Sequence, residues 1–195
     1  VDTGAMYRAM ALYLLREGVD RSNTEQIGEI CQNAEISIEY QIVLLNGENV
    51  NSHLRTEEVG NMASVSSAVP RVREKLLSLQ RKLAKDMSVV MDGRDIGTTI
   101  LPDADVKIYL TASSLTRAKR RYLELQEKGT ICNLDEIQKD IEERDQRDMN
   151  REISPLRQAD DAILVDSSTL TIEQVVDRIL EIFRLKTKKE VSHES

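Results

Sequence analysis

The chain has 195 residues, with 27 Lys or Arg against 34 Asp or Glu, so its formal net charge is −7. This length corresponds to one ordinary domain with a core of its own, and the acidic balance argues against a dedicated DNA-binding domain or a protein that binds anionic membranes. Aromatic residues make up only 3% of the chain, too few for the stacking platforms that bind single-stranded nucleic acid.

Cysteine and histidine usage excludes further classes. Cys31 and Cys132 are far apart, and His53 and His193 lie in unrelated segments, so neither a metal-ligand spacing nor a Ser-His-Asp triad is supported. We expect both thiols to be reduced and partly buried. No stretch is apolar enough for a membrane span, and no signal-peptide pattern begins the sequence. We therefore expect a cytoplasmic protein without a metal site, a membrane partner or a nucleic-acid partner.

The first half of the sequence predicts helices around a small antiparallel sheet. Apolar residues with helical spacing, each run preceded by a capping residue or begun by a proline, predict helices that start near residues 5, 24, 56 and 70. Gly18 ends the first of these helices. Residues 36–40 alternate in polarity, residues 42–45 are apolar, and Asn46-Gly47 is a strong hairpin signal before 48–50.

The second half alternates strands with helices, which predicts an α/β fold with a parallel sheet. The expected strands are short apolar runs at 88–91, 106–110 and 162–165. The expected helices begin at Ser113 or Ser114, at Asn133 and at the Thr171–Gln174 capping box. The residues of the last helix that we expect to face the core are Val175, Val176, Ile179, Leu180 and Phe183.

Three clusters of residues have the chemistry to bind an anion, and the first lies at the start of the first helix. It reads Asp2-Thr3-Gly4-Ala5-Met6-Tyr7-Arg8. A helix N-terminus presents free N–H groups to an anion, Thr3 adds a hydroxyl, and Arg8 can reach back with a planar fork that suits phosphate. The alternative interpretation is a plain capped helix with a surface arginine.

The second cluster is Asp92-Gly93-Arg94-Asp95, directly after the expected strand at 88–91. Ligands bind beyond the carboxyl ends of strands in open α/β sheets, so this position favours a functional loop. The alternative interpretation is a turn whose two acids neutralise Arg94.

The third cluster spaces Arg144, Arg147 and Arg151 by three and four residues, which predicts one helix face with three guanidinium groups. Asp148 shares that face. Three such cations repel one another unless an anion bridges them, and a polyphosphate is the natural candidate. The alternative is an exposed helix whose charges form salt bridges.

Taken together, these clusters resemble the bacterial-type cytidylate kinases, a family of nucleoside monophosphate kinases. The matching segments are, in order, 2–8, Arg55-Thr56, Ser64, 70–73, 92–97, 102–104, 144–151 and Ser154-Pro155-Leu156. The resemblance implies a P-loop NTPase-like parallel sheet flanked by helices, and phosphorylation of CMP and dCMP by ATP with Mg²⁺. It also implies a core domain over 1–30 and 71–195, a lid-like segment at about 117–157 and a monophosphate-binding insertion at 31–70.

The resemblance assigns binding roles to individual residues. Those that would hold the CMP phosphate are Thr3, Arg8 and Arg94. Those that would read cytosine are Ser64, Arg73 and Asp95. Asp95 can accept a hydrogen bond from the cytosine amino group, whereas uracil presents an oxygen there and is rejected.

Further roles implied by the resemblance belong to the lid-like segment. The residues that would contact the sugar are Arg144 and Asp148, and those that would approach ATP are Arg117 and Arg121. The catalytic residues, which would neutralise the transferring phosphoryl group, are Arg94, Arg147 and Arg151. Phosphoryl transfer needs positioning and charge stabilisation rather than a covalent residue.

One element of the family pattern has no match in the sequence. The family begins with a strand, a G-x-x-x-x-G-K-[ST] loop and a helix, and that loop holds the ATP phosphates and helps to hold Mg²⁺. Because the 195 residues contain no such motif, we expect the chain alone to be inactive until the segment is restored. An inactive CMP-binding module and a kinase for another monophosphate, such as UMP, remain alternatives. We expect a monomer whose partners are CMP, dCMP and ATP.

Overall fold

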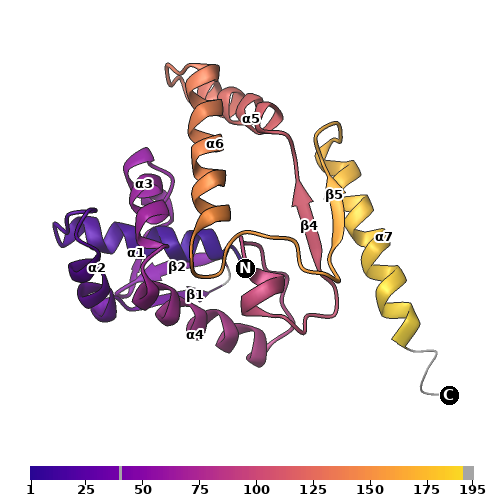
Figure 1. The fold of residues 1–195 in the computed structure, drawn as a ribbon, viewed down its shortest axis with the longest axis horizontal. Helices are drawn as coiled ribbons and strands as arrows, with labels where there is room; N and C mark the ends of the chain where they lie inside the picture. The colour runs from indigo at the N-terminus through magenta and orange to yellow at the C-terminus, as the bar shows by residue number, and fades with distance from the viewer. Residues whose placement is uncertain (40, 191–195) are drawn as a thin grey trace. The chain divides into compact units, whose positions relative to one another are not determined.

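The computed structural model describes residues 1–39 and 41–190 (Figure 1). The chain divides into two compact units, one made of residues 1–96 with 151–154, and the other of residues 97–150 with the chain from 155 on. This division by packing differs from the functional division expected from the sequence, which stays a prediction.

The first unit contains the four helices expected in the first half of the chain. Their bounds are α1 (Thr3–Arg16), α2 (Thr24–Ile30), α3 (Glu57–Ser66) and α4 (Pro70–Asp86). Side chains that cap the first three helices accept hydrogen bonds from free backbone N–H groups, namely Asp2 from Ala5, Asn23 from Gln26 and Thr56 from Val59. Pro70 opens α4, where its missing N–H leaves no donor unpaired.

A small antiparallel sheet lies between α2 and α3 in the sequence, as predicted. Its strands are β1 (Ile36–Glu39), β2 (Ile42–Leu45) and β3 (Glu48–Asn49), with β2 in the middle and Ile36 opposite Leu45. Asn46 and Gly47 have φ values of 49° and 81°, the left-handed pair that a two-residue hairpin turn needs. Tyr40, the last residue of the expected first strand, lies outside the described residues.

The core of the first unit forms around α1. Met6, Met10 and Leu14 are fully buried at helical spacing, and α1 packs against α3, α4 and β2. Cys31 is fully buried in this core, which is more than the partial burial predicted, while Cys132 of the second unit is half-buried as predicted.

The strand expected at 88–91 is wrong. Among the described residues, this part of the chain pairs through a single parallel bridge between Asp2 and Asp92, and Val90 is 89% exposed. An apolar run forms a strand only where another segment pairs with it along its length, and within residues 1–39 and 41–190 this part of the chain has the one bridge.

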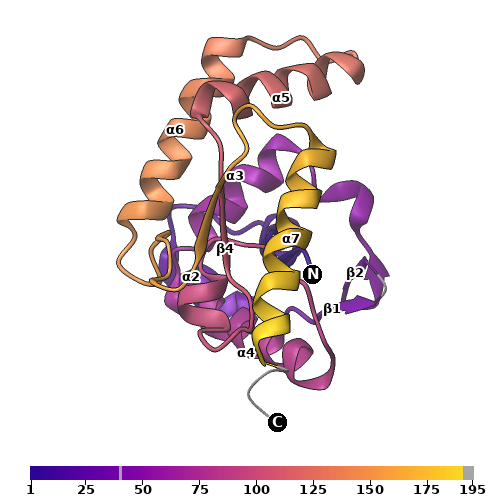
Figure 2. The same ribbon diagram turned by 90° about the vertical axis from the view of Figure 1, so that its right-hand side faces the viewer.

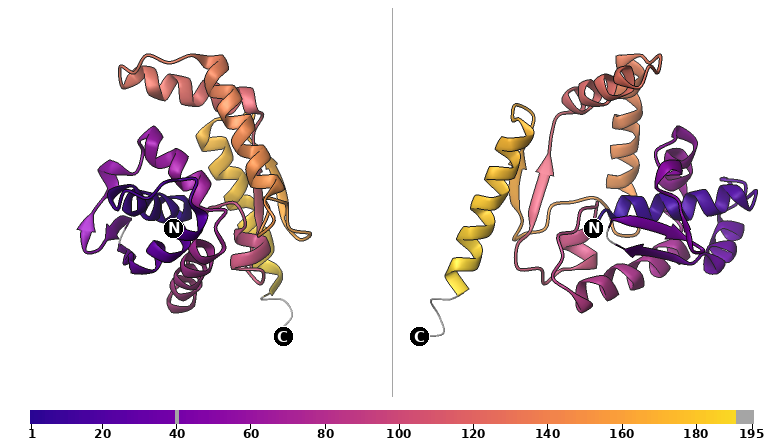
Figure 3. Two further views of the ribbon diagram at one scale, coloured as in Figure 1. Left: turned by 60° about the vertical axis from the view of Figure 1, so that its left-hand side comes forward. Right: turned by 180° about the vertical axis from the view of Figure 1, so that it is seen from behind.

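The second unit begins within a π-helical turn, η3 (Ile96–Ile100). After this turn, it alternates strands with helices. Its elements are β4 (Ile108–Thr111), α5 (Ser114–Glu127), α6 (Leu134–Asn150), β5 (Ile163–Asp166) and α7 (Ile172–Glu190). β4 and β5 pair in parallel with Ile108 opposite Ile163, which confirms two of the three parallel strands expected. The helices α5 and α6 pack on each other, and α7 runs beside the two strands (Figures 2 and 3).

The predicted buried face of α7 is partly wrong. Val175 and Ile179 are half-buried, but Val176, Leu180 and Phe183 are 48%, 42% and 50% exposed. Ile182, which the sequence reading omitted, is the buried residue, because it continues the Val175–Ile179 stripe at helical spacing. Within residues 1–39 and 41–190, no helix combines the length and apolar character that crossing a bilayer requires.

Candidate functional site

The first two clusters identified in the sequence lie side by side in the first unit. The backbone N–H of Thr3 donates to the carbonyl oxygen of Asp92 at 3.2 Å, and the N–H of Asp92 donates to Val1 at 3.1 Å. The Thr3 hydroxyl donates to the same Asp92 oxygen at 2.6 Å. The N-terminus of α1 and the loop that follows Asp92 therefore form one surface.

Two glycines permit the close packing of this surface. A Cβ atom on Gly93 would lie 2.4 Å from the Thr3 hydroxyl oxygen, so glycine alone fits there. A Cβ atom on Gly4 would lie 3.3 Å from Nη1 of Arg8, so the Arg8 guanidinium is folded back over the first turn of α1. This position adds the charge of Arg8 to the positive end of the helix dipole, and its predicted contact with a phosphate stays a prediction.

A buried ionic cluster is centred on Asp95. Nη2 of Arg73 donates to Oδ2 of Asp95, and Nη2 of Arg151 lies 3.6 Å from the other carboxylate oxygen. The three side chains are at most 8% exposed. Asp95 therefore lies between two buried guanidinium groups, and its carboxylate partly offsets the cost of burying them.

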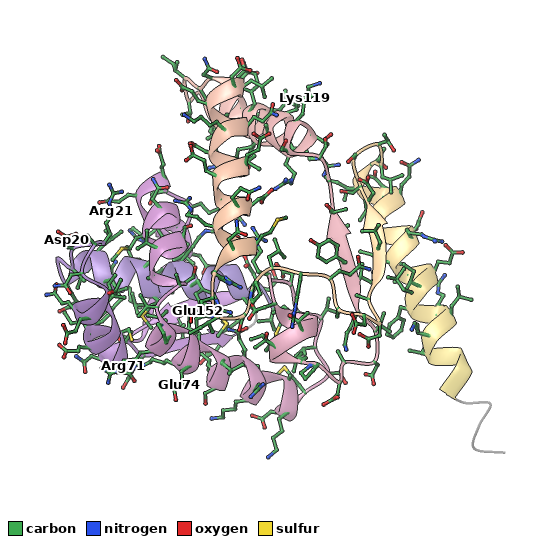
Figure 4. All side chains as sticks on the ribbon, in the orientation of Figure 1. Asp20, Arg21, Arg71, Glu74, Lys119 and Glu152 are labelled. Carbon is green, nitrogen blue, oxygen red and sulfur yellow. The ribbon has the colours of Figure 1, made fainter. Side chains whose placement is uncertain are left out.

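Arg73 is held on more than one side. Its Nη1 donates to the carbonyl oxygen of Ser67 at 3.2 Å, just past the end of α3, and its guanidinium carbon lies 5.5 Å from the centroid of the Tyr7 ring. Its neighbours Arg71 and Glu74 point away from the unit into solvent (Figure 4). Arg73 therefore differs from the other charges of α4 in being buried.

Tyr7 stays a neutral phenol at this site. Burial raises the pKa of Tyr7, and the nearby Asp95 carboxylate adds to that effect, while the Arg73 and Arg151 guanidinium groups and the Gln80 side chain oppose it. Gln80 is 1% exposed on α4. Within the part of the chain that the structure describes, the buried hydroxyl groups of Ser64 and Ser66 have no hydrogen-bond partner. Unpaired buried hydroxyls next to a polar cluster are suited to a ligand.

Sequence reasoning missed Tyr7 and Gln80 as parts of this cluster. Gln80 carried a signal, because it lies seven residues after Arg73 and so shares its helix face within an otherwise apolar stripe. Tyr7 carried none, since its contact with Arg73 joins two helices that are far apart in the sequence.

The second unit holds the remaining candidates, and two arginines of α5 have carboxylate partners. Arg117 donates from Nη1 and Nη2 to the carboxylate of Asp145 on α6 at 3.0 and 2.5 Å, and from Nε to the Ala112 carbonyl at 3.0 Å. Arg121 donates to Glu124 at 2.9 Å. Lys119, on the same helix, is exposed and points into solvent (Figure 4).

The predicted arginine face of 144–151 is only partly confirmed. Arg144, Arg147 and Asp148 lie on α6, where Asp148 is 6% exposed and Arg147 is exposed. Arg151 is not on the helix, because α6 ends at Asn150 and the chain turns so that the Leu156 N–H donates to the Asp148 carbonyl at 2.8 Å. Arg151 itself donates from Nε to Ser154 at 2.7 Å.

The structure thus gathers the larger part of the predicted site in the first unit. The predicted residues placed there are Thr3, Arg8, Ser64, Arg73, Arg94, Asp95 and Arg151. Those placed in the second unit are Arg117, Arg121, Arg144, Arg147 and Asp148. Among the residues described, no group of three or more His, Cys, Asp or Glu side chains could hold a metal ion.

Comparison with known proteins identifies relatives for nearly the whole chain. The family described as cytidylate kinase matches residues 1–185. A cytidylate kinase of Caldicellulosiruptor saccharolyticus is 48% identical over 187 residues, which cover 94% of this chain and 83% of that protein. A cytidylate kinase of Caldicellulosiruptor bescii is 46% identical over 195 residues, covering 98% and 86%, and one of Desulfitobacterium hafniense is 48% identical over 191, covering 96% and 82%.

Proposed function

Because the chain belongs to the cytidylate kinase family, we propose that it transfers a phosphoryl group from ATP, bound with Mg²⁺, to CMP and dCMP. The observation that supports this most directly is the buried Arg73–Asp95 pair on one surface of the first unit, with Arg8 folded over the start of α1. A cationic patch for a phosphate and a buried acceptor for an amino group are what recognition of a cytosine nucleotide requires.

The base is read by Asp95, Arg73 and Ser64. An ionised carboxylate has about four lone-pair positions, so Asp95 can accept from the cytosine amino group while it stays paired with Arg73. Arg73 retains N–H groups for the ring acceptors, and the buried Ser64 hydroxyl adds a further contact. UMP would place an oxygen against the Asp95 carboxylate. Two acceptors would then face each other with no hydrogen between them.

The monophosphate is held by the helix start and by Arg8 and Arg94. The N–H groups of Thr3 and Ala5 already donate to Asp92 and Asp2, so the remaining N–H groups of the first turn of α1 and two guanidinium forks supply the donors. Thr3 donates its hydroxyl proton to Asp92, so this hydroxyl has to turn before it can donate to a phosphate. Arg94 is exposed beside the buried Asp95, in a position to contact ligand from the solvent side.

Phosphoryl transfer then depends on the arginines from the third cluster. We assign Arg144 and Asp148 to the sugar, and Arg147 and Arg151, with Arg94, to the charge that spreads over the transferring group. Arg117 and Arg121 are assigned to ATP. Each of the three guanidinium nitrogens of Arg117 already donates to Asp145 or to the Ala112 carbonyl, so ATP has to compete with these acceptors.

The ATP phosphates also need a P-loop, and no G-x-x-x-x-G-K-[ST] motif occurs in the 195 residues. We propose that turnover requires such a segment in addition to this sequence. The test compares the 195-residue chain with a fusion that carries a strand, a G-x-x-x-x-G-K-[ST] loop and a helix before Val1. ADP release is measured with CMP, dCMP, UMP and AMP as acceptors.

We expect turnover by the fusion alone, with CMP and dCMP preferred. Robust turnover by the 195-residue chain would contradict the P-loop requirement, and a preference for UMP or AMP would contradict the assigned base recognition. The alternative function is a CMP-binding module without catalysis. A fusion that binds CMP and ATP but releases no ADP would support that alternative.

A further inference from the structure

A tyrosine ring supports the buried arginine of the site. The Arg73 guanidinium carbon lies 5.5 Å from the centroid of the Tyr7 ring, a distance at which a cation is attracted to the ring face. Tyr7 comes from α1 and Arg73 from α4, so the contact joins the phosphate end of the site to the base end. The proposed roles of Arg8, Arg73 and Asp95 leave Tyr7 without a function.

Two hydrogen bonds of Arg73 hold the end of its fork. The Ser67 carbonyl accepts from Nη1 and the Asp95 carboxylate accepts from Nη2. An ordered arginine side chain loses torsional freedom along its whole length, so each further contact helps to fix it. The Tyr7 ring lies opposite the guanidinium carbon, and a displaced guanidinium loses the attraction to the ring.

We propose that Tyr7 is a positioning residue for base recognition, whose ring fixes the plane of the Arg73 guanidinium so that Arg73 and Asp95 present a preformed donor and acceptor pair to cytosine. This inference rests on the proposed function. The neutral phenol suits the role, because burial raises the pKa of Tyr7 and keeps a second negative charge away from Asp95. A site ordered before binding loses less entropy when the ligand arrives.

The test measures CMP and UMP binding to the full chain by isothermal titration calorimetry. Tyr7→Phe keeps the ring, whereas Tyr7→Leu and Tyr7→Met remove it with apolar side chains of different shape. We expect the ring-less variants to bind CMP about three- to tenfold more weakly and UMP unchanged, and Tyr7→Phe to stay within about twofold of the parent chain.

A matched control separates positioning from packing. Tyr13 is a buried tyrosine of the same helix, 8% exposed and outside the Asp95 cluster. Tyr13→Leu should lower the urea midpoint yet leave the CMP to UMP preference unchanged. In an Arg73→Met background, Tyr7→Leu should have little further effect on CMP binding, because the group that the ring positions is gone.

The possible outcomes distinguish this inference from the proposed function. If the parent chain shows no preference for CMP over UMP, the base recognition is contradicted, and the positioning role with it. If the parent chain prefers CMP and a folded ring-less variant keeps that preference, only the positioning role is contradicted. Only the positioning role is contradicted also if Tyr7→Phe loses as much of the CMP preference as Tyr7→Leu. In that case the hydroxyl, and not the ring, would support the preference.

Discussion

Asp95 contacts Arg151 across a long gap in the sequence, with 3.6 Å between Oδ1 of the carboxylate and Nη2 of the guanidinium, while its other oxygen accepts from Arg73. A carboxylate that lies against two buried cations has a structural role in addition to the recognition role proposed for it. Its removal takes this counter-charge away from both cations in a buried environment.

Asp95→Asn should therefore affect stability and selectivity together. We expect a loss of unfolding free energy on the order of 3–5 kcal/mol, the range measured when a buried ion pair loses one partner. We also expect a reduced preference for CMP over UMP. Urea denaturation and calorimetric titration measure the two effects. Glu74→Gln, an exposed acid of α4, is the control, and equal effects in both variants would contradict the prediction.

Gly93→Ala should destabilise the junction between α1 and the 92–95 loop. The added Cβ would lie 2.4 Å from the Thr3 hydroxyl oxygen, and overpacking of this kind reduces stability by about 1–3 kcal/mol. Gly60→Ala is the matched control, because a Cβ on Gly60 in α3 meets nothing within 4 Å and should stabilise the helix by about 0.5–1 kcal/mol. Urea denaturation should give opposite signs; a neutral Gly93→Ala would show that Thr3 can move away.

Asp145→Ala should loosen the pairing of α5 with α6. The substitution removes both acceptors of the Arg117 fork and leaves the Ala112 carbonyl, and because the pair is partly exposed we expect a loss of about 1 kcal/mol. Hydrogen exchange should accelerate in both helices. Lys139→Ala breaks an exposed pair to Glu143 at 3.9 Å and should change stability by less than about 0.5 kcal/mol. Similar exchange in the two variants would argue against a role for Arg117 in this packing.

Glu124 should titrate far below an ordinary glutamate. Hydrogen bonds from Lys128 and Arg121 lower the pKa of Glu124 to about 2, whereas an ordinary glutamate has a pKa near 4.5. Since the folded-state pKa is depressed, the stabilisation is present above pH 4.5 and is lost as the pH falls toward 2. NMR titration of the side-chain carboxyl measures the midpoint directly. In Glu124→Gln, the free energy of unfolding should lack this loss at acid pH. A titration midpoint near 4.5 in the parent chain would contradict the ion pairs.

Local patterns in the sequence predicted local structure well. The Asp2 cap, the Asn46-Gly47 hairpin and the Thr171–Gln174 capping box all form as expected, because each depends on residues within a few positions of one another. The reach of Arg8 over its own helix start belongs to the same class.

Features that depend on distant partners were not predictable in this way. The apolar run at 88–91 has strand composition, but whether it pairs depends on residues far from it in the sequence. Which face of α7 is buried also depends on the elements packed against it, and helical spacing alone led to Phe183 in place of Ile182 as an inward residue. Likewise, the position of Arg151 was set by the end of α6 rather than by its spacing from Arg147.

The short return of residues 151–154 to the first unit makes that unit discontinuous along the chain. A fragment that stopped at Ile96 would keep Arg73 and Asp95 but would lack the second cation of the cluster. A truncation or recombination between residues 96 and 151 therefore separates Arg151 from Asp95 inside one unit, even when the cut falls between packed elements. The cluster around Asp95 is for this reason not transferable as a single stretch of polypeptide.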